Sequence, residues 1–315
     1  MNIDIIIPAY NAKKTIMNTL QSIADQTYVK KCSVYIINDA SDYTYVDEIN
    51  HFSKCMNIKE IKLDKNVGPG EARNVGIKNS NNPYIVFIDS DDIFYSPLTI
   101  EKMYTNLINH NGDILISNFI YERDNKVMVK KKNLVWLHGK MYKRSFLTDN
   151  NILFNNTRSN EDNGFNRLCF LLNPVVINYD NITYVYRENP ESITRKNNRL
   201  FRFSGIEGFV YNMNWAIQNA EKKGAASFRI VNVVIGVLVA LYFYYMELYD
   251  EYDVERIIEW SKPMYDYYIK YEKDITKDMI DNFIKLKEKE YSYENKEYNK
   301  VLSFDEFLNK VEKNK

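Results

Sequence analysis

The first third of the chain alternates short apolar runs with segments of helical periodicity. Short, mainly apolar segments predict strands at residues 3–7, 33–38 and 84–88, and we interpret residues 58–63 as a further strand. Apolar residues three or four positions apart predict helices between them, at residues 11–24, 46–54 and 70–78. Strands that alternate with such helices indicate βαβ crossovers and a mostly parallel sheet. Ligands of such sheets bind beyond the carboxyl ends of the strands, so the residues after each strand are the candidates for function.

The pattern changes further along the chain. Residues 100–186 mix helical and strand-like segments, and we interpret the run Lys130–Lys132 as the solvated rim of a hairpin. From Leu200 onward the spacing is helical, with no strand-like alternation. We therefore predict two domains, an α/β domain over residues 1–198 and an all-helical domain over residues 199–315.

One segment of the helical part allows more than one interpretation. Residues 230–246 are apolar except for Asn232 and Gly236, and these 17 residues reach the short limit of a membrane span. The hydroxyl groups of the tyrosines in and beside this segment favour a buried helix or a homodimer contact over peripheral contact with a membrane.

Composition places the chain among globular proteins. Hydrophobic residues make up 45% of the 315 residues, enough apolar surface to offset the entropy lost on folding. Lys+Arg and Asp+Glu both number 42, so the basic excess of a dedicated nucleic-acid-binding protein is missing and nucleic acid is not an expected partner. The 26 tyrosines are unusually many, and we interpret the dense set in residues 242–271 as packing of the helical domain.

Cysteine usage and the N-terminus bear on the compartment. The three cysteines are widely spaced and form no C-x-x-C pair, which argues against a structural zinc site or a disulfide framework. The first residues have no basic region of the kind that begins a signal peptide. We expect a cytoplasmic protein, with the inner face of the membrane as a further possible location.

Polar residues follow each of the four predicted strands. They are Pro8–Asn11, Asn38–Asp39, Asp64–Asn66 and Asp89–Asp92. The last group is a D-x-D-D cluster, whose three carboxylates repel one another. A hard cation such as Mg²⁺ or Mn²⁺ relieves that repulsion by taking oxygen ligands, and the open coordination positions suit the phosphates of a nucleotide.

Motifs of several other enzyme classes are missing. The sequence has no G-x-x-x-x-G-K-[ST] segment, and Gly68-Pro-Gly70 follows the third predicted strand, whereas a Rossmann fingerprint follows the first. A Ser-His-Asp hydrolase is disfavoured because the sequence has no G-x-S-x-G elbow and only three histidines.

Taken together, the strand-end motifs resemble those of the family 2 glycosyltransferases, which have the GT-A fold. The motifs that carry the resemblance are at residues 7–11, 38–41, 66–74 and 87–92. Glu161-Asp162 is similar to the E-D pair of that family, and residues 138–144 before it look like the acceptor-side segment. The resemblance covers roughly residues 1–195. It implies a mixed, mostly parallel sheet flanked by helices, and inverting transfer of a sugar from a nucleotide sugar.

The resemblance also implies which residues bind the donor. They are Pro8, Ala9, Tyr10, Asn11, Asp39, Asn66, Arg73, Asp89, Ser90, Asp92, Arg187 and Ser192. Asp39 would accept a hydrogen bond from the imide N–H of uracil, so a UDP-sugar is the expected donor. Arg73 would bind phosphate oxygens through its planar donor fork. Asp91, together with Asp89, would bind the divalent cation, Mn²⁺ or Mg²⁺.

The catalytic role falls on the E-D pair. Asp162 would be the general base that removes the proton of the acceptor hydroxyl, and Glu161 is the alternative. The segment from Tyr186, with Arg187 and Ser192, resembles the loop that closes over the diphosphate. Some members of the family supply a histidine metal ligand in that loop. Since no histidine follows His138, we expect phosphate and water to complete the metal shell.

The preferred hypothesis is an inverting, metal-dependent glycosyltransferase that uses a UDP-sugar and a glycan or another hydroxyl-bearing acceptor, in polysaccharide or surface glycan synthesis. Two alternatives stay open. A metal-dependent nucleotidyltransferase also binds nucleotides with D-x-D carboxylates, but it does not need Asp162. A non-catalytic assembly scaffold would retain the nucleotide pocket as a relic.

Overall fold

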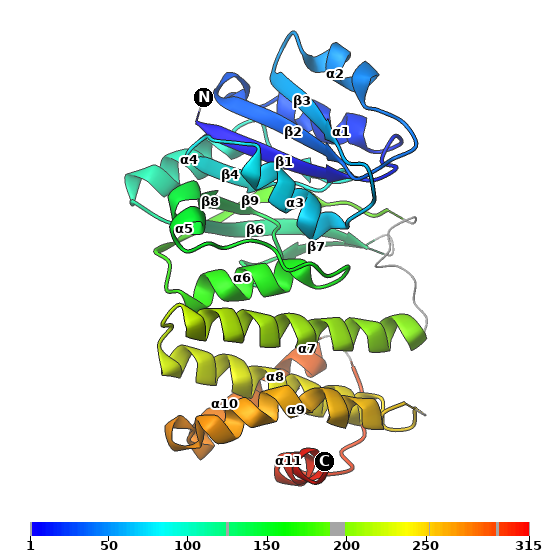
Figure 1. Cartoon of the computed structure of the whole chain (residues 1–315), viewed down its shortest axis with the longest axis vertical. Helices are drawn as coiled ribbons and strands as arrows, with labels where there is room; N and C mark the ends of the chain where they lie inside the picture. Colours follow the sequence, from blue (N-terminus) through cyan, green and yellow to red (C-terminus); the bar gives the residue numbers. More distant parts are fainter. Residues whose placement is uncertain (1, 124–125, 190–198, 252, 294–295, 315) are drawn as a thin grey trace. The chain divides into compact units, whose positions relative to one another are not determined.

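The structure is a computed structural model that describes residues 2–123, 126–189, 199–251, 253–293 and 296–314. The chain divides into two compact units, the N-terminal unit, residues 1–196, and the helical unit, residues 197–315. Figure 1 shows strands with flanking helices in the first and helices in the second. Each unit is described by itself.

A nine-stranded sheet runs through the N-terminal unit, in the order β3-β2-β1-β4-β8-β6-β9-β5, with β7 paired to β6. The strands are β1 (Ile3–Ala9), β2 (Cys32–Asn38), β3 (Asn57–Lys62), β4 (Tyr84–Phe87), β5 (Ile93–Phe94), β6 (Ile114–Arg123), β7 (Lys126–Lys130), β8 (Lys140–Lys143) and β9 (Val176–Tyr186). The helices are α1 (Ile16–Ala24), α2 (Val46–Phe52), α3 (Pro69–Lys78), α4 (Thr99–Asn109), α5 (Arg144–Asp149) and α6 (Glu161–Leu171), with a 3-10 turn at Val29–Lys31.

The first four strands pair in parallel, and the later strands mix both directions. β1 pairs in parallel with β2 and β4, and β2 pairs in parallel with β3. β8 is antiparallel to its neighbours β4 and β6, whereas β6 and β9 are parallel. The predicted α/β class with a mixed, largely parallel sheet and flanking helices is confirmed.

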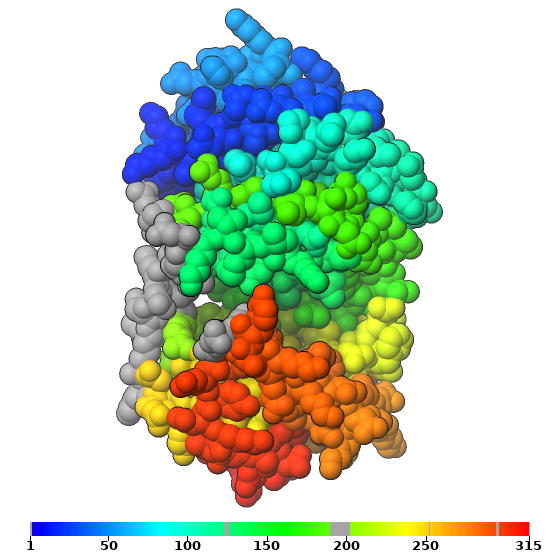
Figure 2. Space-filling view, turned by 180° about the vertical axis from the view of Figure 1, so that it is seen from behind, coloured from blue at the N-terminus to red at the C-terminus, as the bar shows by residue number. Residues whose placement is uncertain are grey.

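Helices cover both faces of the sheet because alternate residues of each strand point to opposite faces. Ile5 of β1 packs in a buried cluster with Leu20 of α1 and Leu107 of α4. Ile6 points to the other face, toward α3, where a Cβ on Gly76 would lie 2.4 Å from Ile6 Cγ2. The surface of α4 is visible from behind in Figure 2. With both faces covered, the carboxyl ends of the strands are where ligands can bind.

The helical unit is built around one long apolar helix. Its elements are α7 (Arg199–Lys222), α8 (Ser227–Glu247), α9 (Glu255–Lys270), a 3-10 turn at Glu272–Asp274, α10 (Lys277–Tyr293) and α11 (Phe304–Lys313). α8 contacts the four other α-helices of the unit. Among the described helices, α8 is the one long and apolar enough to cross a membrane by length and composition. Since 61% of its most apolar stretch is buried inside the structure, it has the character of a core helix.

The tyrosines of this unit combine buried rings with hydrogen-bonded hydroxyl groups. Tyr291 is 2% exposed, and its hydroxyl donates to Glu247 Oε2 at 2.7 Å. Tyr245 donates to Glu255 Oε1 at 2.8 Å, and Tyr242 to the carbonyl of Leu302 at 3.0 Å. Such residues fill the core and still satisfy a polar group at its edge. This packing explains part of the tyrosine excess of the sequence.

Candidate active site

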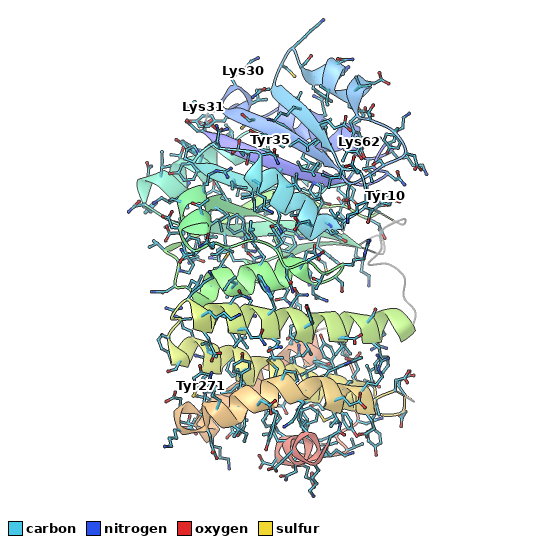
Figure 3. The ribbon with its side chains drawn as sticks, in the orientation of Figure 1. Tyr10, Lys30, Lys31, Tyr35, Lys62 and Tyr271 are labelled. Carbon is cyan, nitrogen blue, oxygen red and sulfur yellow. The ribbon has the colours of Figure 1, made fainter. Side chains whose placement is uncertain are left out.

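The loop after β1 is the first strand end of the predicted pocket. Pro8 and Ala9 are buried and still paired with β2, so of the four predicted pocket residues only Tyr10 and Asn11 are exposed. Tyr10 is 54% exposed at the end of β1 (Figure 3). Asn11 has a left-handed backbone, φ 51°, and its N–H donates to Ser41 Oγ at 2.9 Å. The loop therefore offers an aromatic ring and an amide at the surface.

Asp39, after β2, holds the turn that begins α3. Its Oδ1 accepts the N–H of Val67 at 2.7 Å, and its Oδ2 accepts the N–H of Gly68 at 2.9 Å. Asn66 Nδ2 donates to the carbonyl of Asp39 at 3.2 Å. The structure thus places Asp39 and Asn66 together. Each carboxylate oxygen can accept a second hydrogen bond, so the predicted bond to uracil stays compatible with this arrangement.

Arg73 of α3 joins the D-x-D-D cluster to the E-D pair. Its Nη2 lies 2.6 Å from Asp89 Oδ1 and its Nη1 lies 2.9 Å from Glu161 Oε1. Burial lowers the pKa of Arg73, but Asp89 and then Glu161 outweigh burial and raise it above its ordinary value. α3 can approach Glu161 closely because Gly70 has no side chain. A Cβ at that position would lie only 2.9 Å from Glu161 Cγ. The sequence implied phosphate as the partner of Arg73, and in the structure two carboxylates occupy its fork.

Asp92 is the most buried carboxylate of the cluster, with no exposed surface. Its Oδ2 accepts the hydroxyl of Tyr184 at 2.5 Å and its Oδ1 accepts the N–H of Arg187 at 2.9 Å. Burial, followed by the charges of Asp91 and Asp89, raises its pKa well above the ordinary value. The repulsion that the sequence predicted within the cluster is therefore present in the fold.

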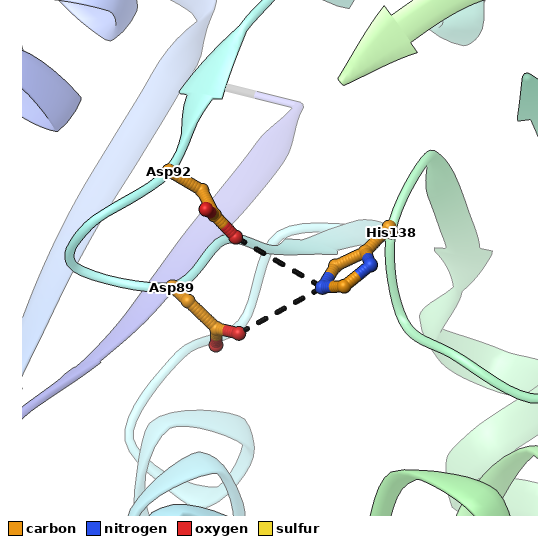
Figure 4. A group of neighbouring side chains, drawn as sticks. All are labelled: Asp89, Asp92 and His138. Atoms are coloured by element: carbon orange, nitrogen blue, oxygen red, sulfur yellow. Dashed lines mark ion pairs between the residues drawn. The ribbon is translucent and has the colours of Figure 1, made fainter. Parts of the chain in front are cut away.

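His138 approaches two carboxylates of the cluster from the segment before β8. Its Nε2 lies 3.9 Å from Asp89 Oδ2 and 3.9 Å from Asp92 Oδ2 (Figure 4). Burial is the main reason that the pKa of His138 is lowered to about 4, so the imidazole is neutral at pH 7, the form that binds metals. For Asp89, burial raises the pKa, but Arg73 and His138 outweigh it and lower it overall, so this carboxyl is ionised.

These side chains fit a divalent cation. One ligand atom from each of Asp89, Asp92 and His138 lies within 4.8 Å of the others, and carboxylate oxygens with a neutral imidazole form a common donor set for such ions. Asp91 lies on the same loop, and its Oδ2 accepts Asn189 Nδ2 at 2.8 Å. Its role as a metal ligand stays a prediction.

Three other residues predicted to bind the donor make few contacts with the acidic cluster or lie outside the described residues. Ser90 lies in the turn of the cluster, partly exposed. The side chain of Arg187 lies 4.0 Å from Glu122 Oε2, and only its backbone N–H reaches the cluster. Ser192 lies outside the described residues.

Asp162 and Glu161 open α6 but differ in their environment. Glu161 is 7% exposed and paired with Arg73. Asp162 makes a local contact, in which its Oδ1 accepts the N–H of Asn163 at 2.7 Å. Burial and then the charge of Glu161 raise the pKa of Asp162 to about 7. A carboxylate with a pKa near the working pH suits proton transfer, so Asp162 is the better candidate for a base.

Sequence reasoning missed the buried residues that hold the segment of His138. Lys140 is 1% exposed, and its ammonium group donates to the carbonyl of Asn133 at 2.6 Å and to that of Trp136. Gly139 has φ +67°, and a Cβ there would lie 2.5 Å from Ser117 Oγ. The signal was the motif at residues 138–144, which was noticed for its acceptor-side resemblance alone.

Comparison with known proteins decides the family. Residues 4–160 match the family described as Glycosyl transferase family 2. This chain belongs to glycosyltransferase family 2. The resemblance inferred from the strand-end motifs is confirmed.

Relatives of this family 2 member include two transferases named for poly(ribitol-phosphate). The chain is 26% identical over 188 residues to poly(ribitol-phosphate) beta-N-acetylglucosaminyltransferase TarS of Staphylococcus aureus, covering 54% of this chain and 33% of that protein. It is 29% identical over 189 residues to a poly(ribitol-phosphate) beta-glucosyltransferase of Bacillus spizizenii, covering 54% and 30%. The matched part thus spans about a third of the length of these relatives.

Solved structures show the fold. The crystal structure of S. aureus TarS 1-349 in complex with UDP-GlcNAc matches with a TM-score of 0.69 at 20% identity, covering 85% of this chain and 80% of that one. A mannosyltransferase from Pyrobaculum calidifontis, in complex with GDP-Man and Mn²⁺, matches with a TM-score of 0.54 at 14% identity, covering 99% and 86%. This member of family 2 has the predicted GT-A fold.

Proposed function

We propose that this enzyme transfers a sugar from a UDP-sugar to an acceptor hydroxyl, with inversion at the anomeric carbon, in the synthesis of a polysaccharide or surface glycan. The observation that carries the proposal is the bridge made by Arg73. It ties Asp89 of the D-x-D-D cluster to Glu161, the residue next to Asp162. A diphosphate bound at the cluster would therefore lie near the candidate base.

The relatives support the donor and the acceptor class. TarS is named for N-acetylglucosamine transfer to poly(ribitol-phosphate), and it has been solved with UDP-GlcNAc. A second relative is named for glucose transfer to the same polymer. We extend to this chain the UDP-linked donor and a polymeric, hydroxyl-bearing acceptor.

In the proposed reaction Asp162 accepts the proton of the acceptor hydroxyl. The acceptor oxygen forms a bond to the anomeric carbon while the bond from that carbon to the diphosphate oxygen breaks, and UDP leaves with the electron pair. Asp91, together with Asp89, would hold a divalent cation, which when bound neutralises charge on the diphosphate. Arg73, through its ion pairs with Asp89 and Glu161, would hold the acidic cluster beside the segment that carries the base.

The helical unit and the location are assigned by prediction. We propose a cytoplasmic enzyme, since the described cysteines are free thiols, as in a reducing compartment. For the helical unit we retain homodimerisation and peripheral membrane contact as roles. Light scattering beside liposome flotation separates them, and a monomer that ignores liposomes would exclude both.

Calorimetry with UDP tests the donor site. We expect UDP to bind in the presence of Mn²⁺ and CDP to bind more weakly, because cytosine has no N3–H for Asp39 to accept. Asp91→Ala is expected to weaken UDP binding mainly when Mn²⁺ is present. Equal binding of UDP and CDP would contradict the role of Asp39, and an Asp91→Ala variant with unchanged affinity would contradict the role of Asp91.

A further inference from the structure

We propose that His138 is a ligand of the divalent cation, together with Asp89 and Asp92, and that its imidazole makes the site prefer Mn²⁺ to Mg²⁺. This inference rests on the proposed function and deepens it. It adds to the acidic cluster a nitrogen ligand from a different segment of the chain, where the sequence predicted that phosphate and water alone would complete the shell.

The spacing of the three side chains fits an ion between them. His138 Nε2 lies 3.9 Å from the facing oxygens of Asp89 and Asp92, which is too far for hydrogen bonds. An octahedral ion with bonds of about 2.1 Å holds neighbouring ligands about 3.0 Å apart and opposite ligands about 4.2 Å apart. The observed distances fall between these values, so an ion can enter with small side-chain rotations. Figure 4 shows the imidazole nitrogen directed between the two carboxylates.

The imidazole is buried without a hydrogen bond to the described residues. Its side chain is 10% exposed, and its Nδ1 is buried with no partner in the part of the chain that the structure describes. The ring is held by packing, with ring centroids 4.8 Å from Tyr184 and 5.3 Å from Phe119. A buried polar ring without partners costs free energy, and a bound ion at Nε2 would offset that cost.

Both carboxylates are oriented by hydrogen-bond donors, as metal-binding carboxylates usually are. Tyr184 and the backbone of Arg187 donate to Asp92, and Arg73 donates to Asp89. The oxygen of Asp89 that faces His138 is not the one that Arg73 binds. For Asp92 the oxygen that faces His138, Oδ2, also accepts the hydroxyl of Tyr184, so this oxygen is both oriented by a donor and directed at the imidazole.

A nitrogen ligand affects which ion the site prefers. Mg²⁺ takes oxygen ligands and releases its water reluctantly, whereas first-row transition ions bind imidazole more readily. With two carboxylates alone, Mg²⁺ and Mn²⁺ would compete on similar terms. We therefore expect the preference for Mn²⁺ to depend on His138.

Electron paramagnetic resonance of Mn²⁺ bound to the 315-residue chain with UDP tests the inference without any assay of activity. In the wild type we expect electron spin echo modulation from an imidazole ¹⁴N. This signal tests the ligand directly in the wild type, so the result does not depend on whether a variant folds. His138→Gln is expected to lose that signal and to bind Mn²⁺ about 10- to 100-fold more weakly. Its affinity for Mg²⁺, measured by competition, is expected to stay within about 3-fold. His110→Gln, at the exposed residue that follows the C-terminal end of α4, is the matched control and is expected to behave as the wild type.

The outcomes separate this inference from the proposed function. If the wild type binds Mn²⁺ with UDP but shows no imidazole ¹⁴N modulation, His138 is not a ligand and the proposed function stands. The same holds if His138→Gln binds Mn²⁺ as tightly as the wild type. If the wild type binds no Mn²⁺ even with UDP, both the inference and the metal dependence of the proposed function are overturned.

Discussion

Asp162→Asn is expected to lower kcat of sugar transfer by about 100- to 10,000-fold, the usual contribution of a general base. Asparagine has nearly the same shape but cannot accept the proton of the acceptor hydroxyl. UDP binding is expected to stay within a few-fold of the wild type, because Asp162 has no part in the acidic cluster. Steady-state kinetics beside calorimetry with UDP would measure the two effects separately.

Glu161→Gln is the comparison variant for Asp162→Asn, because Glu161 is the alternative candidate for the base. It lies one residue away, but it loses the ion pair with Arg73, so it is expected to impair stability and donor binding together with turnover. If Asp162→Asn retained turnover within a few-fold of the wild type, the base would be assigned wrongly. The nucleotidyltransferase alternative would then gain support.

The raised pKa of Asp162, about 7, gives this prediction a dependence on pH. A base must be ionised to act, so kcat is expected to fall about tenfold per pH unit below pH 7 and to level off above it. Stability changes in the opposite direction. The unfolded chain releases this proton near its ordinary pKa, so the shift lowers stability as pH rises from about 4 to 7. Asp162→Asn is therefore expected to melt no lower than the wild type at pH 8.

Arg73→Met is expected to lower the free energy of unfolding of the N-terminal unit by about 3–5 kcal/mol and to abolish turnover. The change removes one partner from two carboxylates, Asp89 and Glu161, and leaves their charges uncompensated in a largely buried place. Chemical denaturation followed by tryptophan fluorescence, with activity measured in parallel, checks both effects.

Lys78→Met on the same helix is the control for Arg73→Met. Lys78 lies 3.8 Å from Glu71, with both side chains partly exposed, and such a surface pair contributes about 0–1 kcal/mol. An Arg73→Met variant that unfolded no more easily than Lys78→Met would show that the bridge between the two motifs has little energetic weight.

The sequence predicted those parts of the fold that depend on local pattern. The four predicted strands are the parallel strands β1 to β4, because short strands with turn residues at their ends are recognisable from local sequence. β1, β2 and β4 are mainly buried, whereas β3 is largely exposed or half-buried. The helix predicted from Asn11 begins only at Ile16, since Asn11 is left-handed and the residues up to Thr15 form turns. The spacing of apolar residues does not reveal that Asn11 adopts a left-handed backbone conformation, so it placed the start of the helix too early.

What the sequence could not show depends on contacts between distant segments. Arg73 and Glu161 are 88 positions apart, and their ion pair exists only because α3 and α6 approach each other at Gly70. His138 precedes β8 and reaches the acidic cluster because β8 lies between β4 and β6, antiparallel to both. No local sequence pattern predicts that position of β8. The residue types of the site were therefore predictable, but their pairing was not.

A hydrolysis screen across nucleotide sugars, without any acceptor, tests the central claim most directly. Water replaces the acceptor hydroxyl slowly, so the assay does not depend on knowing the acceptor. We expect UDP-sugars with Mn²⁺ to give UDP and free sugar, at a rate that Asp91→Ala reduces, and we expect GDP- and CDP-sugars to react much more slowly. Release of UMP in place of UDP, or no cleavage of any nucleotide sugar, would contradict the account.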